Sequence, residues 1–291
     1  MTKVFVLIGG ISNEREVSLS SGKNVSEAAK SEGFDVFTYD FTGNVEDLIL
    51  TIKREKPDVV FNALHGQFGE DGRIQGLLDL MKVKYTHSGQ LASTICMNKV
   101  ITNALLEKNG ILVPKSVVSE SGFSKDPLSR PFVIKPVDDG SSVGVFIVNE
   151  GDDFPKIDYK YAMAEEYIDG KELTVTIFDG KAWVITEIVP LDQGFYDYEH
   201  KYTDNKARHD LPADLPEDIT KDILSTAEKA YKILGCKGVA RADFRYDGDN
   251  FYFLEMNTQP GMTSLSLSPE QAKYDGISYQ KFVRKIIESA L

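Results

Sequence analysis

The chain has 291 residues, of which 42% are hydrophobic and 27% are charged. These proportions are those of a globular protein and argue against a mainly disordered, collagen-like or disulfide-rich chain. Acidic residues outnumber basic ones by 45 to 33, which gives a formal net charge of −12. We therefore expect neither nucleic acid nor an anionic membrane as a partner, although a local basic pocket for phosphates stays allowed. The length fits about two or three domains.

The cysteines and the N-terminal residues indicate the compartment. Cys96 and Cys236 are far apart in sequence and have no neighbouring thiol or matching histidine pattern, so we expect two buried thiols rather than a disulfide or a zinc site. The apolar run 4–8 is too short for a signal peptide, and no run approaches the length of a membrane span. We expect a cytoplasmic protein.

The first ninety residues alternate between predicted strands and helices. The predicted strands span residues 4–8, 34–41 and 58–63. Apolar residues at helical spacing between Val17 and Ala28 predict a helix between the first two strands. This alternation is typical of a parallel sheet, whose ligands bind beyond the carboxyl ends of the strands. We expect residues 9–16 and 64–72 to form that edge.

From about residue 97 the pattern changes to shorter elements. The predicted helices span residues 99–108, 216–234 and 279–290. The predicted strands span residues 132–135, 143–148, 239–246 and 251–257, and residues 172–189 form a hairpin closed by Asp179-Gly180. Residues 195–209 mix aromatic and charged side chains without periodicity, which predicts a long loop that covers a site.

A lysine and a loop of small residues follow one strand. Lys135 ends the strand, and residues 140–144 read Gly-Ser-Ser-Val-Gly. Backbone amides in such a loop can approach a polyphosphate closely, and the lysine supplies a positive charge. The alternative is an ordinary hairpin turn with a solvated lysine. The local sequence leaves both interpretations open.

Two strands near the C-terminus carry the more informative groups. Arg241 and Asp243 alternate on one strand, and Glu255 and Asn257 alternate on the next. If Asp243 lies opposite Glu255, Asp247 pairs with Phe251 across a three-residue connection. Leu254 and Met256 then form an apolar opposite face. Oxygen ligands of this kind suit magnesium, and the alternative is a solvated charged face.

Glu14 follows the first predicted strand, within Gly-Gly-Ile-Ser-Asn-Glu-Arg-Glu-Val. Its carboxylate can hold a substrate ammonium group, or it is simply an acidic residue at a helix N-terminus, which the local evidence favours. The four histidines, including His65, show no metal-ligand spacing.

Five motifs in this order resemble the D-alanine–D-alanine ligase family of the ATP-grasp superfamily. They are Gly9-Gly-Ile-Ser-Asn-Glu-Arg-Glu-Val-Ser, His65-Gly-Gln-Phe-Gly-Glu-Asp-Gly, Lys135-Pro with Gly140-Ser-Ser-Val-Gly, Phe195-Tyr-Asp-Tyr with Lys201-Tyr202, and Glu255-Met-Asn-Thr-Gln-Pro-Gly-Met-Thr. The resemblance spans about residues 4–290. It implies an α/β fold with an N-terminal parallel-sheet, Rossmann-like domain (1–94), a central ATP-grasp subdomain (95–171) and a C-terminal catalytic and metal-binding ATP-grasp domain (172–291).

The resemblance also implies an activity. One D-alanine carboxylate takes the γ-phosphoryl group of ATP, and the amine of a second D-alanine displaces phosphate from the acyl phosphate to give the dipeptide used in peptidoglycan. Phosphorylation supplies the leaving group that a carboxylate lacks, and metal ions offset the gathering negative charge. The implied cofactors are ATP and two Mg²⁺ or Mn²⁺ ions. The family is usually dimeric, so a homodimer is expected.

The family's site residues map onto this sequence by matching position. Glu14 would bind the first ammonium group, with Ser141 and Tyr202 closing the site. Arg241 and the Gly261 amide would stabilise the tetrahedral oxyanion. His65 would lie near the first substrate, and Ser266 and Leu267 would hold the second carboxylate. The residues implied to bind the nucleotide are Lys99, Lys135, Glu165, Tyr167, Ile168, Glu172 and Lys201. The implied metal ligands are Asp243, Glu255 and Asn257.

The sequence departs from the family pattern near the nucleotide. Glu166 and Tyr167 stand where relatives commonly have lysine and tryptophan, and an adenine bound by backbone groups tolerates both changes. Asp138 and Asp139 stand where an arginine-glutamate pair is common, and these acids either weaken ATP binding or recruit a cation.

Two rival interpretations follow. A sister ligase would make D-alanyl-D-lactate or D-alanyl-D-serine, and Tyr202 argues against the lactate enzyme, which typically carries phenylalanine there. A non-catalytic nucleotide-binding protein would not need the full set of catalytic and metal-binding residues.

Overall fold

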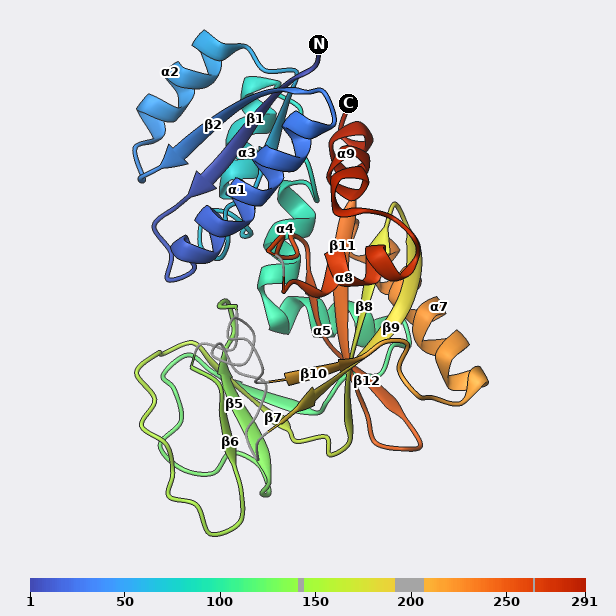
Figure 1. Cartoon of the computed structure of the whole chain (residues 1–291). Coiled ribbons are helices and arrows are strands. Elements are labelled where there is room, and N and C mark those ends of the chain that lie inside the picture. Colours follow the sequence, from blue (N-terminus) through green and yellow to red (C-terminus); the bar gives the residue numbers. More distant parts are fainter. Residues whose placement is uncertain (141–143, 192–206, 264) are drawn as a thin grey trace.

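The computed structural model describes residues 1–140, 144–191, 207–263 and 265–291, and these residues form three sheets (Figure 1). The first sheet is parallel, with the order β2-β1-β3. Its strands are β1 (Lys3–Gly9), β2 (Asp35–Phe41) and β3 (Val59–Asn62). Helices α1 (Arg15–Ser31) and α2 (Val45–Glu55) return the chain between them, as parallel strands require. The predicted α/β arrangement of this segment is confirmed.

Alternation along β1 divides the core of this sheet into two halves. Val4 and Val6 pack in one apolar cluster with α1 and with α9 (Tyr279–Ser289). Phe5 and Leu7 face the other side, against α2 and α3 (Arg73–Met81). The last helix of the chain therefore covers the first sheet, and Figure 1 shows α9 beside α1.

The second sheet is antiparallel and has the order β10-β9-β8-β11-β12. Its strands are β8 (Lys171–Phe178), β9 (Lys181–Pro190), β10 (Ala207–Asp210), β11 (Val239–Tyr246) and β12 (Phe251–Asn257). Helices α4 (Gln90–Met97), α5 (Lys99–Lys108) and α7 (Glu217–Ile233) supply apolar residues to one core with it. The predicted helices 99–108 and 216–234 and the 172–189 hairpin are confirmed. Among the described residues, no helix is long and apolar enough to cross a membrane.

The third sheet has the order β4-β7-β5-β6 and a small core of its own. Its strands are β4 (Ser116–Ser119), β5 (Phe132–Pro136), β6 (Phe146–Val148) and β7 (Ala162–Glu166). Phe132, Ile134, Val148 and Ala164 form the buried part of that core. Figure 1 shows this sheet at the opposite end of the molecule from α2.

The β11–β12 hairpin differs from its predicted form. Asp243 does lie opposite Glu255, but a bulge follows, so that Tyr246 rather than Asp247 pairs with Phe251. The predicted three-residue connection was wrong, because the Asp247 carboxylate accepts hydrogen bonds from the backbone N–H groups of residues 249 and 250 and closes a four-residue turn. The bulge lies at Leu254, the residue with no partner in the ladder.

The predicted loop 195–209 is also partly wrong. Residues 192–206 lie outside the described residues, but Ala207–Asp210 form strand β10, which pairs antiparallel with β9. The His209 Nδ1 lies 2.7 Å from the Glu270 Oε2, a hydrogen bond that connects this strand to helix α8 (Leu267–Tyr274). Backbone pairing and a tertiary contact therefore order a segment that has no sequence periodicity.

A buried glutamine attaches α8 to the second sheet. Gln271 is fully buried, and its Oε1 accepts a hydrogen bond from the Thr176 N–H at 2.8 Å, beside a register shift between β8 and β9. Its Nε2 donates to the Thr174 carbonyl at 3.1 Å and to the Thr186 hydroxyl at 2.8 Å. The side chain thus supplies partners to a backbone N–H and a carbonyl beside the register shift.

We expect Gln271→Met to destabilise the fold. Methionine fills a similar volume but leaves the Thr176 N–H and the Thr174 carbonyl buried without these partners. Each such group costs about 1–3 kcal/mol, so the free energy of unfolding should fall by about 2–4 kcal/mol in denaturant titrations. Gln280→Met, on the exposed surface of α9, is the matched control and should change it by less than about 0.5 kcal/mol. Equal effects of the two changes would contradict the role of Gln271.

Candidate active site

Two adjoining cavities contain the described residues to which the sequence assigned a site role. The first is lined by Glu14, His65, Arg241, Asn257, Gly261, Ser266 and Leu267. The second is lined by Lys135, Glu165, Tyr167, Ile168, Glu172 and Asp243. Lys99 and Glu255 line both cavities. Ser141, Lys201 and Tyr202 lie outside the described residues.

The first cavity lies beyond the carboxyl ends of β1 and β3, the edge that the sequence predicts. Glu14 comes from the loop after β1, and His65 comes from the loop after β3. Gly66 has φ +67°, and a Cβ there would lie 2.7 Å from the Glu14 Oε2, so the glycine lets the two loops meet. A Cβ on Gly140 would lie 3.8 Å from the same oxygen, which brings the start of the serine loop next to Glu14.

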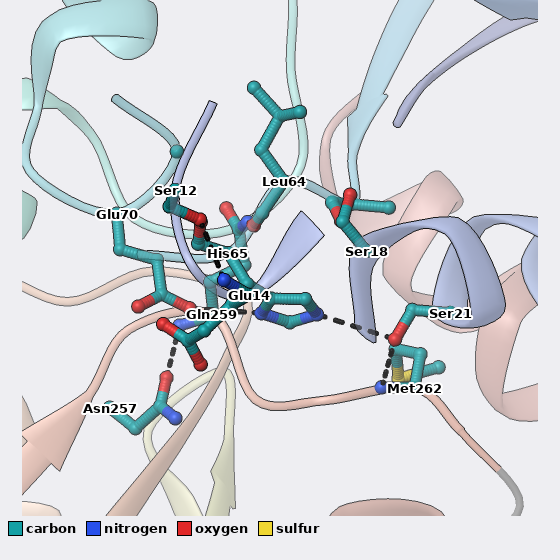
Figure 2. A network of polar contacts seen from close by, with 12 residues as sticks. Ser12, Glu14, Ser18, Ser21, Leu64, His65, Glu70, Asn257, Gln259 and Met262 are labelled. Carbon is teal, nitrogen blue, oxygen red and sulfur yellow. Dashed lines mark hydrogen bonds and ion pairs between the residues drawn. The ribbon is translucent and has the colours of Figure 1, made fainter. Parts of the chain in front are cut away.

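His65 is the centre of a buried polar network (Figure 2). Its Nδ1 lies 3.0 Å from the Glu70 Oε1, and its Nε2 lies 3.3 Å from the Ser21 hydroxyl. Burial by itself disfavours the charged imidazole, but the hydrogen bond and charge of Glu70, with the charge of Glu14, outweigh it and raise the pKa of His65. The network therefore favours a cationic imidazole beside two carboxylates.

The second cavity lies between the third sheet and the second sheet. Lys135 on β5 and Glu165 on β7 form a buried ion pair with an Nζ–Oε1 distance of 2.6 Å. The Glu165 Oε2 is also buried and has no hydrogen-bond partner among the described residues. A buried carboxylate oxygen without a partner is costly, so this edge of the cavity suits a ligand that donates a hydrogen bond.

Lys99 lies in the wall between the cavities. It begins α5, and its Nζ donates to the Asp139 carbonyl at 2.5 Å. Burial lowers the pKa of Lys99, and the charge of Glu255 opposes that shift. The lysine can therefore present a desolvated positive charge to either cavity.

Arg241 and Asp243 form a two-point ion pair on β11, with Nε–Oδ1 and Nη2–Oδ2 distances of 2.9 and 2.8 Å. The Thr174 hydroxyl also donates to the Asp243 Oδ1, at 2.6 Å. The ladder places Glu255 opposite Asp243 and Asn257 opposite Arg241. Hydrogen bonds thus hold the arginine and both carboxylate oxygens of Asp243 in one orientation.

The donor set at this wall fits magnesium. No group of three or more His, Cys, Asp or Glu side chains is arranged to hold an ion within the part of the chain that the structure describes. Asp243 and Glu255 provide two carboxylates, and Asn257 provides an amide oxygen. Magnesium typically takes one or two carboxylates and completes its shell with substrate phosphates and water, so this smaller set matches its needs.

Sequence reasoning missed several lining residues. Leu254 was expected on the opposite face with Met256, but the bulge turns it into the second cavity beside Glu255. Arg245 lines the same cavity, with its guanidinium 5.6 Å from the centre of the Tyr167 ring and 3.7 Å from a Glu172 oxygen. Arg245 follows Arg241 and Asp243 at the same two-residue spacing, and that signal could have assigned it to the site.

Glu70 and Cys96 also line the first cavity without having been assigned. Glu70 stands in the quoted histidine motif, so the motif could have indicated it. Cys96 and Cys236 are buried free thiols, as expected, and the hydrogen bond between them and burial raise the pKa of Cys96. No sequence signal brings these cysteines together, because they lie 140 residues apart (236 − 96).

Comparison with known proteins decides the family. The model of the D-ala D-ala ligase C-terminus matches residues 100–288, and the model of the D-ala D-ala ligase N-terminus matches residues 42–88. The chain is 47% identical to a D-alanine–D-alanine ligase of Zymomonas mobilis, over 99% of this chain and 94% of that protein. The chain belongs to the D-alanine–D-alanine ligase family.

Other members of the D-alanine–D-alanine ligase family agree with this assignment. A ligase of Rhodospirillum rubrum is 46% identical over 99% of this chain and 98% of that protein. A crystal structure of the Bacillus anthracis ligase complexed with ATP has a TM-score of 0.85 and 29% identity over 100% of this chain and 97% of the other. The fold of the family, with one parallel and two antiparallel sheets, is thus the fold of this chain.

The pair of His65 and Glu70 predicts a measurable pH dependence. In Glu70→Gln, burial remains while the main stabilising charge is lost, so the pKa of His65 should fall below its ordinary value of about 6.5. Imidazole NMR titration measures this directly. Glu16→Gln removes an exposed carboxylate from the same region and should leave the pKa of His65 unchanged.

The raised pKa of His65 also fixes how its contribution to the stability of the fold changes with pH. Because the pKa of His65 is raised in the folded protein, its contribution to stability is fully present below the unfolded pKa and is lost as the pH rises through the folded pKa. In Glu70→Gln, where the folded pKa of His65 falls below the unfolded one, the sign should reverse, and the free energy of unfolding should rise as the pH rises through those two values. A His65 titration that is the same in Glu70→Gln and in the unmodified protein would contradict the assignment.

Proposed function

We propose that this chain joins two D-alanine molecules into D-alanyl-D-alanine at the expense of ATP, through an acyl phosphate, for peptidoglycan synthesis. The observation that carries the proposal is the pair of adjoining cavities with Lys99 and Glu255 in their shared wall. One cavity suits a small amino acid and the other suits a nucleotide. A phosphoryl group can pass from ATP to a carboxylate only where two such sites meet.

The second cavity is proposed to hold ATP. The unpartnered Glu165 Oε2 suits the amino group of adenine, and the backbone around Tyr167 and Ile168 would contact the base. Glu172 would accept hydrogen bonds from the ribose hydroxyls. The phosphates would extend toward Lys99 and Lys135, and Lys201 is proposed to join these two.

Asp243, Glu255 and Asn257 are proposed as the residues that would hold two Mg²⁺ or Mn²⁺ ions. The ions would offset negative charge on the phosphate oxygens when bound. The position of Glu255 in both cavities supports this role. The pairing of Asp243 with Arg241 supports a site in which the arginine holds the carboxylate in one orientation.

The first cavity is proposed to hold the amino-acid substrates. Glu14 would bind the ammonium group of the first D-alanine, with His65 nearby and with Ser141 and Tyr202 closing the site. Arg241 and the Gly261 amide would stabilise the oxyanion that forms when the second amine attacks. The second carboxylate would be held by Ser266 and Leu267, at the start of α8.

The other expectations stay proposals. The division at residues 1–94, 95–171 and 172–291, with substrate-binding, central and catalytic parts, agrees with the separation of the three sheets along the chain. A homodimer and a cytoplasmic location are proposed from the family and from the use of ATP.

The proposed reaction predicts phosphate release that depends on D-alanine. The purified protein, incubated with ATP, Mg²⁺ and D-alanine, should release one phosphate for each D-alanyl-D-alanine that mass spectrometry detects. D-Lactate or D-serine offered with D-alanine should give much less mixed product, which tests the sister-ligase alternative. No D-alanine-dependent phosphate would overturn the proposal.

Glu255→Gln should lower kcat by about 100-fold or more, because it removes a negative charge from the proposed metal site while keeping the shape of the side chain. Coupled phosphate release measures the effect. Glu46→Gln, on the exposed surface of α2, is the control and should keep normal turnover. Near-normal activity of Glu255→Gln would refute the metal assignment.

A further inference from the structure

A buried pair of amide side chains connects two loops of the first cavity. Asn62 ends β3, and Gln259 follows β12; both are almost completely buried. The Asn62 Nδ2 donates to the Gln259 Oε1 at 2.6 Å, and the Gln259 Nε2 donates to the Leu64 carbonyl. The two residues are 197 positions apart in sequence, so the contact joins separate parts of the chain.

Each amide also holds its own loop. The Asn62 Nδ2 donates to the Gly69 carbonyl at 2.9 Å, and the Asn62 Oδ1 accepts from the Leu64 N–H at 3.2 Å. The Gln259 N–H donates to the Asn257 Oδ1 at 2.9 Å. Asn62 therefore shapes the loop that carries His65, and Gln259 shapes the segment that carries Asn257.

A second connection runs parallel to the first. The Met262 N–H donates to the Ser21 hydroxyl at 3.2 Å, and that hydroxyl lies 3.3 Å from the His65 Nε2 (Figure 2). Segment 259–262 is thus attached to the His65 loop directly at Gln259 and, through Ser21 of α1, at Met262. Gly261 lies between the two attachments and lines the first cavity.

Burying two primary amides needs a reason beyond packing. Two apolar side chains of similar size would fill the space without desolvating polar groups, and such replacements are often neutral or stabilising. A fully satisfied amide pair has only a few acceptable geometries, so it fixes the spacing of the loops it joins. Here it fixes the spacing of His65 and Glu70 on one side and Asn257 and Gly261 on the other.

We propose that Asn62 and Gln259 are positioning residues for the ligation step. They keep the loop that carries His65 at a fixed distance from the segment that carries Asn257, a proposed metal ligand, and Gly261, whose amide is proposed to stabilise the oxyanion. This inference rests on the proposed function. A displacement of about 1 Å between reacting groups can cost about 100-fold in rate, so the pair acts on kcat rather than on nucleotide affinity.

The test compares Gln259→Met, Asn62→Leu, the double variant and a control, Gln75→Met. Gln75 is as buried as Gln259 and donates to the same Gly69 carbonyl as Asn62, at 2.7 Å, but its bond joins α3 to the loop just before it and does not reach segment 257–262. All proteins are assayed as full chains for kcat, for KM of ATP and of D-alanine, and for Tm. The double variant replaces both polar partners with apolar ones, so it stays informative if a single variant folds poorly.

Each single change at Asn62 or Gln259 should lower kcat by about 10- to 100-fold while KM for ATP stays within about two-fold. The double variant should lose no more than the worse single variant, because both changes break one connection. Gln75→Met should lower Tm but keep kcat within about two-fold.

Three results would overturn the inference: a Gln259→Met kcat equal to that of Gln75→Met, effects that multiply in the double variant, or a loss that falls on KM for ATP as much as on kcat. Each of these leaves the proposed function intact, since the unmodified protein still makes dipeptide. An unmodified protein that makes none overturns the proposed function itself, and the inference with it.

Discussion

The bulge in β12 determines which groups face the two cavities. In a regular ladder, Leu254 and Glu255 would point to opposite faces of the sheet. The shift between Asp243 and Phe244 leaves Leu254 without a partner, and both residues then line the second cavity. An apolar side chain and a carboxylate thus lie side by side, which suits a ligand with an aromatic base at one end and phosphates at the other.

Charge is the second constraint, because an acidic chain must accept an anionic nucleotide. The cations of the site are partly neutralised before any ligand binds, since Lys135 pairs with Glu165 and Arg241 pairs with Asp243. These pairs stabilise buried charges that would otherwise be expensive. At Lys99, burial disfavours the charged ammonium group, and this lowers its pKa. The net charge of −12 therefore says little about the local field at the shared wall.

The sequence predicted the regular helices and strands and which residues gather at the site. It failed where an irregularity of the backbone or a contact between distant segments determines the structure. Alternation was sufficient to group Arg241 with Asp243 and Glu255 with Asn257, because residues two apart on a strand share a face. The pairing of Asp243 with Glu255 was only a condition, which the ladder meets. Alternation could not show the bulge, which depends on how the Asp247 turn closes. Helix α8 was missed because its short sequence has no clear apolar face, and Gln271 attaches it through polar contacts.

No local sequence pattern could predict the contact between Asn62 and Gln259, because it joins two distant segments. Polar residues at the end of a strand and in a turn look solvated when read along the chain, and only the meeting of the two segments buries them. The same holds for Glu70, whose effect on the pKa of His65 needs the folded loop.

The apolar clusters connect the two cavities to the rest of the fold in different ways. Val239 at the start of β11 and Met262 beyond β12 belong to the same apolar cluster as Val4 and Val6 of the parallel sheet. Segments from both sides of the first cavity therefore contribute to one apolar cluster, and separating them would expose that apolar surface to water. The third sheet has its own small core, so the second cavity lies between two cores. Bond formation between two small substrates needs the tighter geometry, and the first cavity is the one whose two sides are joined by a shared apolar cluster and a buried amide pair.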